Sequence, residues 1–189
     1  AFIPFVADIY RYDEAGAGLL LTYIGVLGAL NQGVVVRALS RRYADTRLAV
    51  AGATLLVGAL AALPFAPELG RALLPGLPLG FGPELLALLV VLAVLSGGNG
   101  LLTVGITAMV STAASEERQG SAFGVTQGAG SLGRTLGPPV MTAIYVLYYW
   151  APFLLGALLA VGVVVVLVVV ARRSAAFAPG SAESGPGRL

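Results

Sequence analysis

Long apolar runs separated by short polar turns make up most of this chain of 189 residues. A helix needs roughly 18 apolar residues or more to cross the hydrocarbon core of a bilayer. The runs that reach this length cover residues 17–38, 84–112, 120–148 and 151–171, and the run 48–66 is just long enough. Residues 1–10 look like the end of one further helix. The pattern therefore predicts an all-α polytopic membrane protein whose transmembrane bundle covers residues 1–173.

The segments outside these runs have a different composition. Residues 65–83 are rich in proline and glycine, which is typical of a loop, here one that lies partly along the membrane interface. Residues 174–189 are small, polar and rich in proline and glycine, so we expect a disordered tail.

The overall composition supports a membrane protein and excludes several kinds of chemistry. Hydrophobic residues make up 58% of the chain and charged residues 11%, whereas soluble domains carry about 25% charged residues. The chain contains no cysteine and no histidine, which excludes disulfides, thiolate or imidazole metal sites and catalysis by these side chains. We expect no cofactor, no metal, no nucleic-acid partner and no enzymatic activity. The chain begins with Ala1 inside an apolar segment, which suggests that an upstream part is missing.

The distribution of arginine predicts the orientation in the membrane. Basic residues concentrate on the cytoplasmic side of membrane proteins. The turn after the run 17–38 carries four arginines and one aspartate. The protein is expected in the cell (plasma or inner) membrane. Alternating spans then place this turn, the turn at Glu116 and the carboxyl terminus on the cytoplasmic side. The charged residues of the turn are Arg37, Arg41, Arg42, Asp45 and Arg47.

The segment EERQGSAFGVTQGAGSLGRTLGPP, residues 116–139, carries glycines on a helical face. Glycines at four-residue spacing let a neighbouring helix approach closely, and they serve either tight packing or helix sliding during gating. The consecutive prolines free backbone carbonyls one turn earlier, which predicts a kink. The residues concerned are Gly124, Gly128, Gly133, Gly137, Pro138 and Pro139.

Arg134 lies fourteen residues beyond Gly120, or about 21 Å along the helix. An arginine at that depth is costly and marks either a structural site, bonded to freed carbonyls or to another part of the protein, or a water-filled cavity. Gln127 lies on the same segment, where an amide acts either as a cavity ligand or in interhelical hydrogen bonds.

A second polar interruption lies near the centre of the run 84–112. Ser96-Gly-Gly-Asn99-Gly weakens the helix and leaves one amide side chain at mid-membrane depth. Flexible or broken helices at this depth build substrate sites in many transporters, although Asn99 could also bond to a neighbouring helix. Thr103 continues the face of Asn99. Asn31 and Gln32 offer the same two alternatives, ligand or interhelical bond.

The order of the spans, the turn NQGVVVRALSRRYADTR and the segment of residues 116–139 resemble the carboxyl-terminal half of a major facilitator superfamily transporter. Within that superfamily they resemble the drug:proton antiporter branch that includes tetracycline-efflux-type proteins. The resemblance implies two six-helix bundles that rock about a central site. On this mapping residues 1–10 end the seventh span, Asn99 belongs to the tenth, and Gln127 and Arg134 belong to the eleventh.

The resemblance also assigns roles. Gly33 and the charged residues of the arginine-rich turn echo the family's gating motif, with Ala44 where relatives often have glycine. We expect this turn to act as a charge latch for the inner gate. Gln32, Asn99, Thr103, Gln127 and Arg134 are the candidates for the substrate cavity.

These observations lead to a hypothesis of proton-coupled efflux of small hydrophobic or amphipathic compounds by alternating access. No aspartate or glutamate lies in the middle of the five complete spans, so the coupling carboxylate is expected in the missing amino-terminal six-helix half. The expected partners are the lipid bilayer, that other half, a small-molecule substrate and protons. The alternatives are an uptake permease for a sugar or metabolite of the same fold and a non-transporting fragment.

Overall fold

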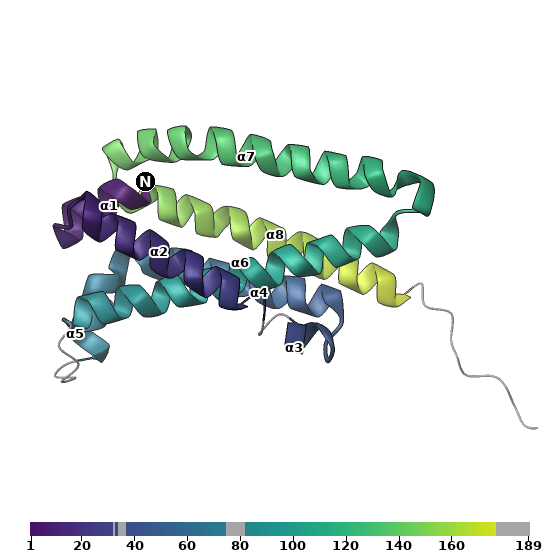
Figure 1. Cartoon of the computed structure of the whole chain (residues 1–189), viewed down its shortest axis with the longest axis horizontal. Coiled ribbons are helices and arrows are strands. Elements are labelled where there is room, and N and C mark those ends of the chain that lie inside the picture. The colour runs from purple at the N-terminus through teal and green to yellow at the C-terminus, as the bar shows by residue number, and fades with distance from the viewer. Residues whose placement is uncertain (32, 34–36, 75–81, 177–189) are drawn as a thin grey trace, which may run out of the picture.

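The computed structural model describes residues 1–31, 33, 37–74 and 82–176, all of whose secondary structure is helical (Figure 1). This confirms the predicted all-α fold class. Gln32 lies outside the described residues. In chain order the elements are α1 (Phe2–Tyr10), α2 (Glu14–Leu30), α3 (Arg37–Ser40), α4 (Asp45–Ala62), the 3-10 turn η2 (Leu63–Phe65), α5 (Ala66–Leu73), α6 (Pro83–Ala113), the 3-10 turn η3 (Glu116–Arg118), α7 (Gln119–Leu147) and α8 (Ala151–Ala176).

Local sequence signals explain several helix ends. Arg11 follows α1 in the left-handed conformation, with φ of 57°, which ends that helix. The Asp13 carboxylate accepts a hydrogen bond of 2.9 Å from the backbone N–H of Gly16 and caps the start of α2. Pro83 occupies the first position of α6, where its missing N–H has no helical partner to lose.

Within the described residues, the segments Asp45–Leu73, Pro83–Ala113 and Ala151–Arg173 are long and apolar enough to cross a membrane. The first of these joins α4, η2 and α5. Helix α2 is apolar but shorter in its described part. Helix α7 has the length to span a bilayer, but glycine, serine, threonine and glutamine dilute its apolar residues.

Helices α4 and α6 form the tightest pair, and glycines make their contact possible. A Cβ atom placed on Gly98 would lie 2.9 Å from the carbonyl oxygen of Gly52, and one on Gly105 would lie 2.7 Å from the backbone nitrogen of Ala49. No side chain fits between backbones this close. We call this contact the α4–α6 seam, defined by Gly52, Gly98 and Gly105.

The seam corrects the expectation that the Ser96–Gly100 stretch weakens its helix. Helix α6 is continuous from Pro83 to Ala113. Glycine costs helix stability relative to alanine, but here Gly98 contacts the backbone of α4, and close packing offsets that cost.

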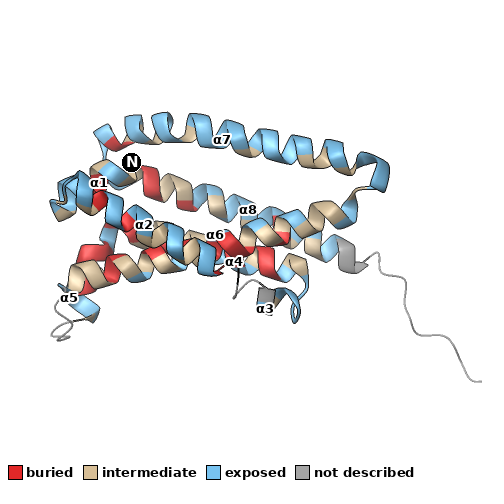
Figure 2. Ribbon diagram, viewed as in Figure 1, coloured by how far each residue is buried: buried red, intermediate tan, exposed pale blue. Residues whose placement is uncertain are grey.

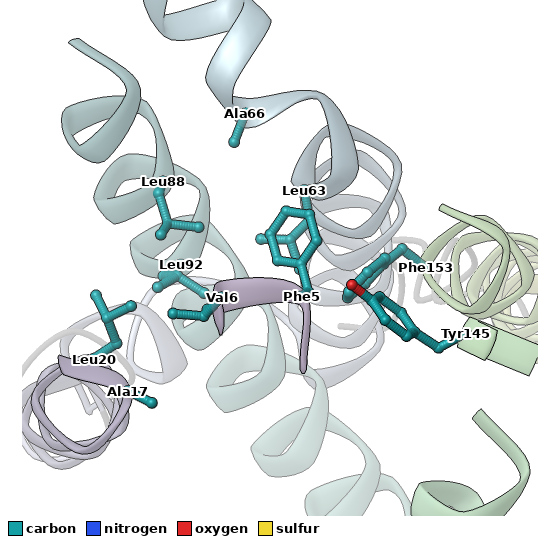
Figure 3. Packing of buried hydrophobic residues seen from close by; sticks show 10 residues of the cluster. All are labelled: Phe5, Val6, Ala17, Leu20, Leu63, Ala66, Leu88, Leu92, Tyr145 and Phe153. Carbon is teal, nitrogen blue, oxygen red and sulfur yellow. The ribbon is translucent and has the colours of Figure 1, made fainter. Parts of the chain in front are cut away.

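The largest buried cluster lies at the end of the bundle where α1 ends and α8 begins (Figure 3). Phe5 is fully buried, and its ring lies edge-on to Phe153 at a centroid distance of 5.1 Å. The cluster draws on α1, α2, η2, α5, α6, α7 and α8, so it fastens this end of the bundle. Its members are Phe5, Val6, Ala17, Leu20, Leu63, Ala66, Leu88, Leu92, Tyr145 and Phe153.

Helix α5 gives the proline- and glycine-rich segment more structure than a plain loop. Its Gly70 lies so close to Pro83 that an added Cβ atom would overlap the backbone at the start of α6. Arg71 and Glu84 add an exposed ion pair of 3.3 Å across the same junction, and such pairs contribute little. The remainder of the segment, residues 75–81, lies outside the described residues.

Helix α7 differs from the other long helices. Most of its residues are exposed along its whole length, whereas α4 carries buried residues from Leu48 to Ala59 and α6 from Ala87 to Gly105 (Figure 2). Its one buried residue is Tyr145, near its carboxyl end. Helix α7 is therefore fastened to the bundle mainly at that end.

Candidate functional site

Asn99, Thr103 and Thr107 form a polar stripe along one side of α6. Four-residue spacing places the three side chains on one helical face, and all three residues are exposed. The Thr107 hydroxyl donates to the backbone carbonyl of Thr103 at 2.7 Å, while no described residue bonds to the amide of Asn99. Since the α4–α6 seam closes a different side of α6, this helix has one sealed side and one open polar side.

Asn31, which the sequence left between two roles, acts in interhelical bonding. It is buried, and its Nδ2 atom lies 3.4 Å from the carbonyl oxygen of Ser96 and 3.2 Å from that of Gly97. In the opposite direction, the Ser96 hydroxyl lies 3.5 Å from the carbonyl oxygen of Ile24. These bonds fix α2 against the glycine-rich centre of α6, directly before Asn99.

The candidate residues of α7 share a face of their own. Gln127 and Arg134 are seven residues apart, two helical turns, and both are exposed. The Arg134 guanidinium folds back along the helix, where Nη2 lies 3.4 Å from the Ser131 hydroxyl and Nη1 lies beside Gly130. Its only hydrogen bond in the described structure is therefore long and local, which leaves its charge available to a partner.

The glycines and prolines of α7 make few contacts in this structure. A Cβ atom added at any of the four candidate packing glycines would meet no atom within 4 Å. The helix runs without interruption through Pro138 and Pro139. Tight packing by these glycines remains a prediction, because nothing packs against their face of α7 in this structure. The four glycines are Gly124, Gly128, Gly133 and Gly137.

The arginine-rich turn lies between α2 and α4 and is exposed. Arg41, Arg42 and Arg47 are exposed, and Asp45 begins α4. Backbone bonds of 2.9 and 3.0 Å from Arg42 and Tyr43 to the carbonyl of Leu39 shape the turn. Within the part of the chain that the structure describes, these arginines form no ion pair with Asp45. Gly33 is exposed, and Arg37 begins α3.

The structure also pairs two residues that the sequence did not connect. Asp8 at the end of α1 accepts a hydrogen bond of 2.8 Å from the hydroxyl of Tyr145 on α7. Tyr145 is 9% exposed and belongs to the large buried cluster, with its oxygen directed away from the α7 backbone (Figure 3). The sequence contains no sign of this bond, because a contact across 137 residues leaves no local signal.

Taken together, the candidates fall into separate groups. The stripe of α6 and the pair on α7 share no hydrogen bond or ion pair among the described residues. Neutral amides and hydroxyls on α6 can exchange hydrogen bonds with a ligand, and Arg134 can pair with an anion or a carboxylate. This combination suits recognition of a small molecule, since it supplies polar contacts and one positive charge.

Comparison with known proteins gives one match. A family model described as Major Facilitator Superfamily matches residues 1–188. No curated protein and no solved structure matches the chain. The family match covers nearly the whole chain, including every helix described above.

Proposed function

Because the chain belongs to the Major Facilitator Superfamily, a family of multi-pass secondary transporters, we propose that it forms the carboxyl-terminal half of a proton-coupled exporter. The cargo in this proposal is a small hydrophobic or amphipathic compound, moved by alternating access. The two sides of α6 carry the argument: glycines seal one side against α4, and Asn99 and Thr103 lie open on another. A central span built this way can line a path without weakening its own bundle.

In this proposal Asn99 and Thr103 bind polar atoms of the cargo, and Gln127 and Arg134 contribute from α7. Gln32, outside the described residues, is assigned to the same cavity. Polar groups inside a membrane are costly, so a helix retains them where they meet water, a ligand or each other. Asn31 is excluded from this group because its amide already bonds to α6.

The inner gate in this proposal is the arginine-rich turn. Arg41, Arg42 and Arg47 have no acidic partner among the described residues, so we assign their partner to an amino-terminal bundle that also supplies the coupling carboxylate. The positive-inside rule places this turn and the carboxyl terminus in the cytoplasm. Arg41, Arg42 and Arg47 are then available to close the inner side when the two bundles meet.

Drug accumulation tests this proposal directly. Cells that express the complete transporter should accumulate less of an amphipathic compound than cells with an empty vector, and a protonophore should abolish the difference. Unchanged accumulation for every compound tested would overturn the exporter. Accumulation above the control, sensitive to the same protonophore, would instead indicate an uptake permease of the same fold.

A matched pair of variants tests the role of α6. Thr103→Val removes a hydroxyl from the polar stripe, and Thr54→Val removes one from α4, where it bonds only to its own helix at 2.8 Å. We expect Thr103→Val, combined with Asn99→Leu, to lower export at wild-type expression. Thr54→Val should leave export unchanged. Equal export by all variants would remove the stripe from the cargo path.

A further inference from the structure

An apolar groove of about 650 Å³ lies between α6 and α8. Its α6 side consists of Ile106, Met109, Val110 and Ala113, and its α8 side is centred on Gly162 and Val166. Both sets recur at intervals of three and four residues, so each forms one continuous helical face. The groove thus runs along two helices that are apolar enough to cross the membrane.

The packing on α4 explains why the groove exists. Ala49 and Ala53 of α4 are fully buried against Leu167 of α8, with Met109 of α6 packed on the same cluster. Both α6 and α8 thus lie on α4, but the two make few contacts with each other. Gly162 widens the groove further, because a Cβ atom at this position would meet no atom within 4 Å.

A hollow of about 940 Å³, lined by both polar and apolar residues, continues the groove beyond the end of α6. Val110 and Ala113 line both the groove and the hollow, so the two spaces are adjacent. The hollow is lined in addition by Ser115 and Arg118 of the turn and by Ser121 of α7. The side chain of Gln119 donates to the carbonyl of Ser111 at 3.2 Å and holds this turn against α6.

Three arginines and two glutamates lie at this end, and of these five Arg118 alone lines the hollow. Arg118 is exposed and forms no ion pair with any described residue. Arg173 lies seven residues after Val166, on the same face of α8 and about 10 Å further along it. Arg172 adds another positive charge, while Glu116 and Glu117 share the turn with Arg118 but do not line the hollow.

We propose that the groove and the hollow together bind one phospholipid with an anionic headgroup. An acyl chain lies in the groove between α6 and α8, and the phosphate lies at Arg118 and Arg173. Arginine suits this task because its planar guanidinium donates paired hydrogen bonds to phosphate oxygens. Basic groups between spanning helices attract anionic lipids in the same way.

The charge pattern distinguishes a lipid from the other occupant that the fold offers, which is α7 itself. Four residues of α7 lie beside the hollow, and two of them, Ser121 and Thr126, are polar, whereas the groove is lined almost wholly by aliphatic side chains. A lipid matches both parts, since its chain is apolar and its headgroup is charged.

Native mass spectrometry of the complete, delipidated transporter tests the headgroup. The probes are phosphatidylglycerol and phosphatidylethanolamine with identical acyl chains. The wild-type protein should retain more phosphatidylglycerol, and Arg118→Gln with Arg173→Gln should reduce that preference about fivefold for each arginine at low ionic strength. Arg42→Gln, in the turn between α2 and α4, is the charge control and should keep the preference. Equal retention of both lipids by the wild-type protein, or a preference that survives the double substitution, would overturn the proposal.

A second pair of variants tests the groove. Gly162→Leu fills it and should reduce retention of both lipids, whereas Gly58→Leu, at an equally open glycine of α4 outside the groove, should not.

A photoreactive phenylalanine analogue at Val163 tests the groove by crosslinking, which does not depend on a change in protein stability. It should capture added phosphatidylglycerol, whereas the same analogue at Leu158 should not. Capture of α7 in place of lipid, or no capture of lipid, would overturn the proposal. None of these readouts requires transport, so they stand apart from the test of export.

Discussion

Glycines act in opposite ways in the α4–α6 seam and in α7. In the seam, Gly52, Gly98 and Gly105 lie against the backbone of the facing helix, and any side chain would collide. In α7, Gly124 and Gly128 are four residues apart on one helical face, yet a Cβ atom on either would meet nothing within 4 Å. Glycines on a helical face thus form a closed contact in one place and an open surface in the other.

The difference shows that spacing alone does not identify the partner of a glycine face. The partner of the α6 glycines is another helix of this chain. Helix α7 is held by Tyr145 at one end and is exposed along most of its length (Figure 2). We infer that its glycine face meets the second bundle of the proposed transporter, where it would become a seam in its turn.

The largest effect on stability is expected from filling the seam. Gly52→Leu forces side-chain atoms toward the carbonyl of Gly98, which lies 2.6 Å from the position of an added Cβ atom. Overpacking of this kind costs about 1–3 kcal/mol or more. Thermal unfolding in detergent should show a clear loss of stability.

Gly124→Leu is the matched control for this substitution, because it adds the same side chain to α7. In this chain without the second bundle, the variant should unfold at the wild-type temperature, because an added Cβ atom would meet nothing within 4 Å. If both variants lost stability equally, the seam and the face of α7 would not differ as described.

Removing the tether of α7 should have a smaller effect. Tyr145→Phe deletes the hydroxyl that bonds to Asp8 at 2.8 Å and keeps the ring in its cluster. Polar bonds between membrane helices are worth about 0.6 kcal/mol on average and at most about 1.7, and we expect about 1 kcal/mol. Hydrogen exchange of α7 should increase while that of α4 stays unchanged. Equal protection of α7 in both proteins would argue against a tether.

Asn31→Leu tests the contact of α6 with α2, on a side other than the α4–α6 seam. The substitution removes two long bonds, of 3.2 and 3.4 Å, to the carbonyls of Gly97 and Ser96. We expect a loss of about 0.6 kcal/mol, measured by chemical unfolding. Export should persist, since the proposal gives Asn31 no contact with the cargo; loss of export without loss of stability would place it in the path.

The smallest effect on stability is expected at Arg134, where the effect on function should be complete. Arg134→Ala removes an exposed side chain whose one hydrogen bond is 3.4 Å long, so stability should change by less than about 0.5 kcal/mol. Transport should be abolished while membrane insertion persists. Normal export by this variant would indicate that Arg134 has only a structural role. Arg134→Lys keeps the charge and changes the geometry of the donor, so it distinguishes the two contributions.

Features that depend on neighbouring residues were readable from the sequence. The apolar run 84–112 predicted a helix that extends from Pro83 to Ala113. The hydrophobic period of a helix is local, so a single chain carries it. The family resemblance likewise rested on continuous motifs and agrees with the family match over residues 1–188.

Features that depend on distant residues could not be read in this way. The Ser96–Gly100 stretch looked like a weak point because its partner, Gly52, lies more than forty residues earlier. Asn31 and Asn99 looked alike as lone amides, but only Asn31 has a partner among the described residues. The chemistry of each amide was visible in the sequence, whereas its neighbour was decided by packing.

The bond between Asp8 and Tyr145 has a consequence for how the protein is made. Its two ends are separated by 137 residues, and a chain leaves the ribosome at about 5–20 residues per second. Asp8 is therefore synthesised several seconds before Tyr145. Phe5 likewise precedes Phe153 of α8, which it contacts in the folded bundle. The buried cluster at this end is therefore complete only after α8 has been synthesised.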